Sequence, residues 1–449
     1  MSWTTESWQS KQTTNPYGDA EALKTAKAKL ASLPPLVTSW EIERLRDLTA
    51  EAQDGKRLWL QGGDCAESLA DCTSEVIASK LKILLQMSLV LLDATKKPVI
   101  RVGRLAGQYA KPRSNPMETK VVDGRAVELP AYQGDLLNAT PFTPEARIPN
   151  PQRLIDGYQH AAMTLNFVRS LVQGGFADPH HPENWELGDR ALELEPSLRD
   201  AYMHSRENLR RVLDLAKALD VPDSAALTAV EFYVSHEGLN LHYEAAQTRR
   251  VPRRDGYYNL TTHFPWIGER TRQLDGAHIE YFRGIVNPIG IKLGPSVTAD
   301  TALNLIDVLN PTNASGKIVL ISRLGARKIN DVLPSLVRAI DKSKRRVLWV
   351  CDPMHGNTRS TQSGVKTRDV SDVLSEVRSA IAVHREAGTV FGGVHVELTG
   401  ENVTECVGGS MALSDSDLAR SYTSLCDPRL NYGQALELAV DMAKTLTGR

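Results

Sequence analysis

Short aliphatic or β-branched runs alternate with longer helical patterns from residue 58 onward. The runs suited to strands lie at residues 58–61, 98–104, 227–234, 257–263, 289–294, 317–323, 346–351 and 393–398. Strands that alternate with helices form parallel βαβ units. A doubly wound sheet normally uses about five or six strands and a Gly-rich phosphate turn, which this sequence lacks. Eight runs therefore predict an α/β fold, a (β/α)8 TIM barrel.

The first 55 residues have helical patterns of their own. Asp19 can cap a helix over residues 20–33, which Pro34 and Pro35 stop. Thr38 and Glu41 then form a capping box for a second helix. We expect an N-terminal helical extension over residues 1–55 and a catalytic barrel domain over residues 56–449.

A long segment, residues 107–226, separates the second strand from the third. It holds a polar loop and two helical stretches, residues 151–173 and 196–219. Loops beyond about 15 residues usually have a purpose of their own. We expect a helical insertion over about residues 150–222 that covers the site, forms a subunit interface or binds an effector, and the sequence leaves these alternatives open.

Composition narrows the class of partner. The net charge of −1 gives no basic excess for nucleic acid or for an anionic membrane surface. Residues 83–92, the most apolar stretch, are far short of the roughly 20 residues that span a bilayer. Five cysteines show no CxxC pair, which argues against a zinc ribbon or a disulfide framework. The N-terminus has no secretory signal pattern, so we expect a cytoplasmic protein.

Polar residues follow nearly every predicted strand. The carboxyl ends of barrel strands are where these folds keep their active sites. The residues at these positions are Cys65, Arg104, His236 with Glu237, Glu269 with Arg270, Lys292, Arg323, His355 and Glu397. Any one of them is unremarkable alone, but their joint placement at one face of a barrel predicts a site.

Three of these residues predict a metal centre. Cys65, His355 and Glu397 offer sulfur, imidazole and carboxylate. This mixed set suits Mn, Fe, Co or Zn rather than calcium or magnesium. Asp427, between the last strand and the last helix, is the expected fourth ligand.

The cations form a second group. They are Arg104, Arg270, Lys292 and Arg323. Their convergence in a nearly neutral chain predicts a strongly anionic small substrate, because guanidinium groups match phosphate and carboxylate with paired hydrogen bonds. Lys111, Arg113 and the Ser114 hydroxyl form another cluster that suits a second phosphate.

Longer sequence blocks carry a family resemblance. LWLQGGDCAE, RLAGQYAKPRS, WIGERTRQLDGAH, CDPMHGNT, GENVTECVGG and CDPRLN occur in this order. Blocks of this length are far more specific than short motifs. The chain closely resembles the type II 3-deoxy-D-arabino-heptulosonate 7-phosphate (DAHP) synthases over nearly its whole length. The resemblance implies a transferase that condenses phosphoenolpyruvate with erythrose 4-phosphate, the first step of the shikimate pathway and of aromatic amino acid biosynthesis.

The resemblance also implies roles for residues. One divalent ion, Mn²⁺ with Co²⁺, Fe²⁺ or Zn²⁺ as alternatives, would be held by Cys65, His355, Glu397 and Asp427. Phosphoenolpyruvate would be held by Arg104, Glu269, Arg270, Lys292 and Arg323, and erythrose 4-phosphate by Lys111, Arg113 and Ser114. We assign catalytic roles to Cys65 and Lys292, with Lys292 as the hypothetical proton donor. Because Cys426 precedes Asp427, its sulfur should lie near Cys65, and oxidation should join the two and expel the metal.

The sequence also leads to expectations about partners and leaves two alternative functions open. The resemblance implies a homo-oligomer, a dimer or a tetramer, with an aromatic amino acid as effector and a chorismate mutase as protein partner. One rival is a secondary-metabolism relative that uses an amino or imino sugar phosphate. The other is a non-catalytic regulatory barrel subunit, which the retention of every expected ligand and cation argues against.

Overall fold

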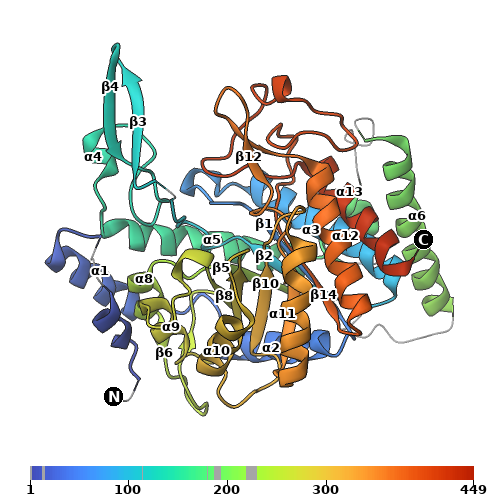
Figure 1. Cartoon of the computed structure of the whole chain (residues 1–449), viewed down its shortest axis with the longest axis horizontal. Coiled ribbons are helices and arrows are strands. Elements are labelled where there is room, and N and C mark those ends of the chain that lie inside the picture. The colour runs from blue at the N-terminus through green and yellow to red at the C-terminus, as the bar shows by residue number, and fades with distance from the viewer. Residues whose placement is uncertain are drawn as a thin grey trace.

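Eight parallel strands close into a barrel (Figure 1). The computed structural model describes residues 3–12, 16–113, 115–178, 181–186, 194–218 and 230–448. Around the barrel the order is β1-β14-β11-β10-β9-β8-β5-β2. The strands are β1 (Leu58–Gly63), β2 (Val99–Arg104), β5 (Phe232–Glu237), β8 (Phe264–Ile267), β9 (Ile289–Leu293), β10 (Ile318–Ser322), β11 (Val347–Cys351) and β14 (Phe391–Glu397). The predicted fold class is confirmed.

Helices surround the barrel because each presents one apolar stripe to the strands. In α11 the buried residues include Ile329, Leu333, Leu336 and Ile340, at the three- and four-residue spacing of one helix face. The helices after the strands are α3 (Ser74–Thr95), α5 (Gln152–Gln173), α6 (Pro196–Ala218), α8 (Leu241–Ala246), α9 (Ala277–Phe282), α10 (Ala299–Leu309), α11 (Ile329–Ser343), α12 (Val370–Glu386) and α13 (Tyr432–Thr447). Short helices are η1 (Ser7–Lys11), η2 (Leu69–Asp71), α4 (Pro144–Arg147), η3 (Pro182–Trp185), η5 (Glu269–Thr271) and η6 (Asp415–Asp417).

Two capped helices precede the barrel, as predicted. Asp19 accepts a hydrogen bond from the backbone N–H of Ala22 at 2.9 Å and starts α1 (Ala20–Ser32). Thr38 and Glu41 form the capping box of α2 (Ser39–Gln53). Leu45 and Leu48 of α2 share one apolar cluster with the residues that fill the barrel, such as Trp59. Helix α2 therefore covers the barrel end at which the strands begin, and leaves the carboxyl ends for the site.

The fourth predicted strand, residues 257–263, was wrong. The barrel strand is β8, and β7 (Tyr258–Asn259) instead pairs with β6 (Thr248–Arg249) in an antiparallel ribbon. Thr261 donates to Glu244 at 2.7 Å within a buried polar network, whereas Phe264 and Trp266 belong to the apolar cluster of the barrel. Packing of the Phe264 and Trp266 rings inside the barrel therefore favours β8 over residues 257–263 as the barrel strand. The third strand begins at Phe232, and residues 227–229 of that prediction lie outside the described residues.

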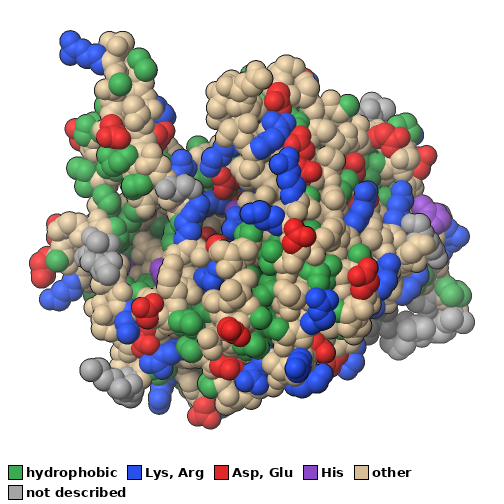
Figure 2. Space-filling view, in the orientation of Figure 1, with side chains coloured by type: hydrophobic (Ala, Val, Ile, Leu, Met, Phe, Trp, Pro, Cys, Tyr) green, Lys and Arg blue, Asp and Glu red, His purple; other side chains and the backbone are tan. Residues whose placement is uncertain are grey.

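The insertion after β2 contains the two predicted helices, α5 and α6, which both pack against α3. It also contains a hairpin, β3 (Met117–Val122) with β4 (Arg125–Pro130), where the sequence predicted only a polar loop. Asp123 and Gly124 turn the chain with φ of 49° and 75°, the backbone that a two-residue hairpin turn requires. The hairpin stands clear of the body (Figures 1 and 2), and Val121 is 75% exposed.

A second hairpin follows β11. It consists of β12 (Thr358–Ser360) and β13 (Lys366–Arg368), which pair antiparallel. None of the helices in the described part of the chain is long and apolar enough to cross a membrane.

Candidate active site

A cavity of about 350 Å³ collects most of the predicted site residues. The carboxyl ends of six barrel strands and the loops after them supply Lys111, Glu237, Glu269, Arg270, Lys292, Arg323 and His355. The segment before α13 supplies Asp427, and the β12–β13 hairpin supplies Thr358, Arg359, Ser360 and Lys366. These residues are distant in sequence. The parallel register brings them together because the carboxyl ends of all barrel strands meet at one end.

Three of the four predicted metal ligands form one group, and the fourth, His355, contacts one of them. Ligand atoms of Cys65, Glu397 and Asp427 lie within 4.8 Å of one another. His355 Nε2 lies 3.0 Å from Glu397 Oε1. Lys111 is beside them, with its Nζ 3.1 Å from both Glu397 Oε1 and Asp427 Oδ2.

The chemistry of this donor set fits a borderline divalent ion, because thiol, imidazole and carboxylate occur together. Glu397 is fully buried, and the Asp427 side chain is 16% exposed. Burial acts to raise the pKa of Glu397, but His355, Lys111 and Arg368 outweigh it and hold that pKa well below its usual range. A buried carboxylate held in its charged form needs neighbouring positive charge, which a bound cation would add to.

Arg104 lies behind this cluster. Its side chain is buried and donates to the carbonyl oxygens of Asp64 at 2.9 Å and Cys65 at 3.2 Å. It also donates to Glu397 Oε1 at 3.1 Å and contacts His395 Nε2. The predicted phosphoenolpyruvate residue thus orients the loop that carries Cys65 and the end of β14.

The other predicted cations face the cavity. Arg323 Nη2 donates to the His355 carbonyl at 3.0 Å, and Arg270 Nη1 donates to the Pro112 carbonyl at 3.4 Å. Glu269 accepts from the Gly294 N–H at 2.6 Å and pairs with Arg272 at 2.7 Å, which fixes η5 and its arginine.

Lys292 has a buried carboxylate partner. Its Nζ lies 2.9 Å from Asp352 Oδ2. Burial lowers the pKa of Lys292, and Asp352 opposes that effect by favouring the ammonium. The lysine is thus held next to the cavity with a charge partner on one side.

The cluster predicted for erythrose 4-phosphate is divided. Lys111 faces the cavity and the ligand cluster, whereas Arg113 Nη1 donates to Cys426 Sγ at 3.3 Å. Arg113 also lines a neighbouring cavity of about 310 Å³. Ser114 lies outside the described residues.

Several site residues escaped the sequence analysis. Glu237 was noticed as following a strand but received no role, and it lines the cavity. His236 beside it is buried and pairs with Glu244 at 2.8 Å. Asp352 had the same strand-end position as the predicted ligands. Arg368 gave no signal at all, because the strands of its hairpin are only three residues long.

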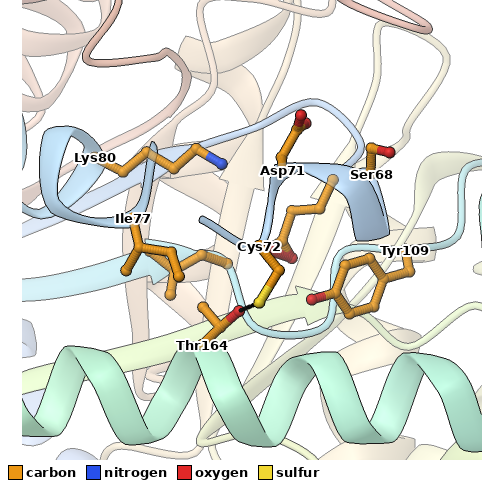
Figure 3. A pocket seen from close by; sticks show the side chains of 9 residues that line it. Ser68, Asp71, Cys72, Ile77, Lys80, Tyr109 and Thr164 are labelled. Carbon is orange, nitrogen blue, oxygen red and sulfur yellow. Dashed lines mark hydrogen bonds between the residues drawn. The ribbon is translucent and has the colours of Figure 1, made fainter. Parts of the chain in front are cut away.

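A much smaller cavity lies beside the loop after β1 (Figure 3). Its volume of about 10 Å³ has room for one water molecule. Lys80 from α3 points into it and also pairs with Asp64, the neighbour of Cys65. Cys72 Sγ lies 3.3 Å from Thr164 Oγ1 on its far side. This cavity is too small for a phosphorylated substrate, and its residues hold the loop in place.

Comparison with known proteins decides the family. The profile of the class-II DAHP synthetase family matches residues 3–443. The chain belongs to the class-II DAHP synthetase family. The family that the sequence blocks resemble is confirmed, and with it an enzyme of the DAHP synthase class.

Curated relatives agree over nearly their full length. The chain is 45% identical to the phospho-2-dehydro-3-deoxyheptonate aldolase of Neurospora crassa over 455 residues, 97% of this chain and 93% of that protein. It is 47% identical to that of Streptomyces coelicolor over 428 residues, 95% and 93% of the two chains. It is 41% identical to that of Mycolicibacterium smegmatis over 438 residues, 96% and 92%.

Among solved structures, the DAHP synthase of Thermotoga maritima matches 86% of this chain and 68% of its own, at 15% identity and a TM-score of 0.33. This similarity is too low to add to the family assignment. Class-II DAHP synthetases are generally metal-dependent, and the cluster of Cys65, Glu397 and Asp427 is compatible with that property.

Proposed function

We propose that this family member condenses phosphoenolpyruvate with erythrose 4-phosphate in the cavity at the carboxyl end of the barrel. The observation that supports the proposal is a single cavity that adjoins both a set of possible metal ligands and a group of cationic side chains. Arg270, Lys292 and Arg323 line this cavity together with His355 and Asp427, which belong to a sulfur, nitrogen and oxygen donor set completed by Cys65 and Glu397.

The cations suit the charges of the two substrates. Phosphoenolpyruvate carries a carboxylate and a phosphate, which Arg270, Lys292 and Arg323 would hold through charge-assisted hydrogen bonds. Lys111, Arg113 and Ser114 are proposed for the phosphate of erythrose 4-phosphate. Holding two polyanions side by side against their repulsion supplies both proximity and electrostatic stabilisation.

The reaction balances with water as the third reactant. C3 of phosphoenolpyruvate bonds to the aldehyde carbon of erythrose 4-phosphate, water adds at C2, and the C2–O bond to phosphate breaks. The aldehyde oxygen gains a proton, for which Lys292 is the proposed donor. Lys292 is buried beside the cavity with its ammonium held by Asp352.

Cys65, His355, Glu397 and Asp427 are the proposed ligands of one divalent ion, with Mn²⁺ expected and Co²⁺, Fe²⁺ or Zn²⁺ as alternatives. When bound, such an ion supplies Lewis-acid stabilisation for the negative charge that develops on the aldehyde oxygen.

One assay tests this function directly. Phosphate release is measured from the two substrates with and without a chelator, after which Mn²⁺, Co²⁺, Fe²⁺ and Zn²⁺ are added back separately. We expect chelation to abolish release and at least one metal to restore it. Absence of release with every metal would contradict the proposal, and faster turnover of an amino or imino sugar phosphate would favour the secondary-metabolism reading.

The accessory features are proposals of the same kind. We propose an N-terminal extension over residues 1–55 and a barrel domain over residues 56–449, in a cytoplasmic dimer or tetramer that responds to an aromatic amino acid and accepts a chorismate mutase partner. Sedimentation with and without each aromatic amino acid tests this part.

A further inference from the structure

Two cations on strand β13 contact the two carboxylates of the ligand cluster. Lys366 Nζ lies 2.8 Å from Asp427 Oδ1, and Arg368 Nη2 lies 2.8 Å from Glu397 Oε2. Lys366 and Arg368 are two residues apart, so the strand directs them to the same face. Thr367 between them donates to the Glu405 carbonyl at 2.9 Å. We call Lys366 and Arg368 together the β13 clamp.

In both Glu397 and Asp427, one carboxylate oxygen contacts the β13 clamp and the other contacts Lys111. The other oxygen of Glu397 is Oε1, which lies 3.1 Å from Lys111 Nζ, 3.0 Å from His355 Nε2 and 3.1 Å from Arg104 Nη2 behind the cluster. The other oxygen of Asp427 is Oδ2, also 3.1 Å from Lys111 Nζ. One oxygen of each carboxylate therefore faces the centre of the ligand cluster, and the clamp holds the other.

Arg368 also joins the segments that carry the ligands. Its Nε donates to Thr358 Oγ1 at 3.0 Å, three residues after His355. Its Nη1 donates to the carbonyl of Pro428, the neighbour of Asp427. The side chain is fully buried, so water does not screen these contacts. One guanidinium thus contacts three segments that carry proposed ligands, at Thr358, Glu397 and Pro428.

We propose that the β13 clamp is a positioning device that makes Glu397 and Asp427 single-oxygen ligands and thereby sets which cation the site accepts. The inference rests on the proposed metal site. Ca²⁺ takes six to eight oxygens and often binds carboxylates through both oxygens. A site whose carboxylates each offer one oxygen, beside a thiol and an imidazole, disfavours Ca²⁺ and favours ions that accept four to six mixed ligands.

The two residues of the β13 clamp should contribute unequally to metal affinity. Arg368 is 0% exposed, whereas the Lys366 side chain is 46% exposed. Exposed ion pairs contribute little, whereas residues that orient a metal ligand from a buried position typically change metal affinity about 10- to 100-fold. The effect should therefore come mainly from Arg368.

The test measures Co²⁺ binding to the metal-free full chain. Binding is followed by thiolate-to-Co²⁺ absorption, and the Kd is set by competition with a chelator. Arg368→Lys keeps the positive charge but loses the guanidinium that contacts Thr358, Pro428 and Glu397. We therefore expect the Kd of this variant for Co²⁺ to rise about 10- to 100-fold. Lys366→Met should change it less than about fivefold. Arg378→Lys is the matched control, because Arg378 pairs with Asp441 at 3.0 Å between α12 and α13, and its Kd should not change.

Ca²⁺ competition separates positioning from general stability. Excess Ca²⁺ should displace Co²⁺ from Arg368→Lys at a Ca²⁺ to Co²⁺ ratio at least about tenfold lower than from the wild type. A role limited to folding would lower the thermal midpoint of the metal-free protein and leave this ratio unchanged. An Arg368→Lys protein with wild-type Kd and wild-type Ca²⁺ competition would overturn the clamp.

Two outcomes need a separate reading. A wild-type chain that binds no Co²⁺ would refute the proposed metal site itself, before the clamp is at issue. If circular dichroism shows Arg368→Lys unfolded, Thr358→Val provides the test, because it removes the acceptor of Arg368 Nε at the cost of one further long contact, from Thr358 Oγ1 to the Met354 carbonyl at 3.4 Å. We expect about threefold weaker Co²⁺ binding from the loss of one hydrogen bond, and unchanged binding and competition in Thr358→Val would then overturn the clamp.

Discussion

Lys292 Nζ lies 2.9 Å from Asp352 Oδ2. The same oxygen accepts a hydrogen bond from His355 Nδ1 at 2.8 Å. One buried carboxylate therefore holds both the proposed proton donor and a proposed metal ligand. With its proton held on Nδ1 by Asp352, a neutral His355 would present the Nε2 lone pair to the proposed metal ion.

Asp352→Asn tests this relationship. The amide keeps the size of the side chain but loses the charge that holds Lys292 and orients His355. We expect Kd for the metal to rise about 10- to 100-fold and kcat to fall by a similar factor at saturating metal. Phosphate release and Co²⁺ absorption measure the two effects. Asp331→Asn, an exposed change on α11, is the control, and an Asp352→Asn enzyme that matches it in both measurements would disprove the linkage.

Lys292→Met tests the proton donor. General acid catalysis contributes about 10²- to 10⁴-fold, so kcat should fall by at least a hundredfold while Co²⁺ binding persists. Lys292→Arg should remain as slow, because a guanidinium keeps the charge but does not release its proton in this pH range. Rapid-quench measurement of phosphate release gives kcat for each. Normal turnover by Lys292→Met would remove the assignment.

Oxidation should couple Cys65 to Cys426. The Asp427 N–H donates to Cys65 Sγ at 3.2 Å, and the nearby Cys65 thiol lowers the pKa of the preceding Cys426 to about 7. Mild treatment with diamide should consume both thiols, release the metal and stop turnover, and dithiothreitol should reverse all three. Cys426→Ser should keep its metal under the same treatment. Unchanged metal content with both wild-type thiols still free would count against the idea.

Glu376 should make stability depend on pH. Burial raises the pKa of Glu376 from 4.5 to about 7, although it accepts from the Leu324 and Gly325 N–H groups and from Asn357. The raised pKa means that the folded state favours the protonated acid. Its stabilising contribution is complete below pH 4.5 and is lost as the pH rises through about 7.

Glu376→Gln imitates the protonated form and should remove this dependence. Between about pH 4.5 and about pH 7.5, the wild type should lose on the order of 2 kcal/mol of unfolding free energy relative to the variant. Urea unfolding at each pH measures the difference. Parallel curves for the two proteins would show that Glu376 titrates normally.

Much of the barrel was predictable because each strand has a local sequence pattern. Buried parallel strands read as aliphatic runs, and the first polar residue after each run marks the end that carries the site. For this reason the sequence alone places Cys65, Lys292, Arg323 and His355 near strand ends. The capping residues Asp19 and Thr38 were equally local signals.

Side-chain direction was not predictable in the same way. Arg104 ends β2 and Arg270 follows β8, yet Arg104 is buried behind Cys65 and Arg270 lines the cavity. Lys111 and Arg113 are two residues apart but contact different groups, Glu397 and Cys426. These outcomes depend on which neighbours fill the space around each side chain.

The sequence by itself determined the barrel, the capped helices before it and the set of residues that meet at its carboxyl end, because periodicity and strand order are properties of the chain. Only the tertiary structure decided that β8 begins at Phe264, that Asp352 joins Lys292 to His355, and that Arg368 holds Glu397 by one oxygen. The physical reason is that buried charges are paired by residues far away in sequence, and a pairing of that kind leaves no local pattern to read.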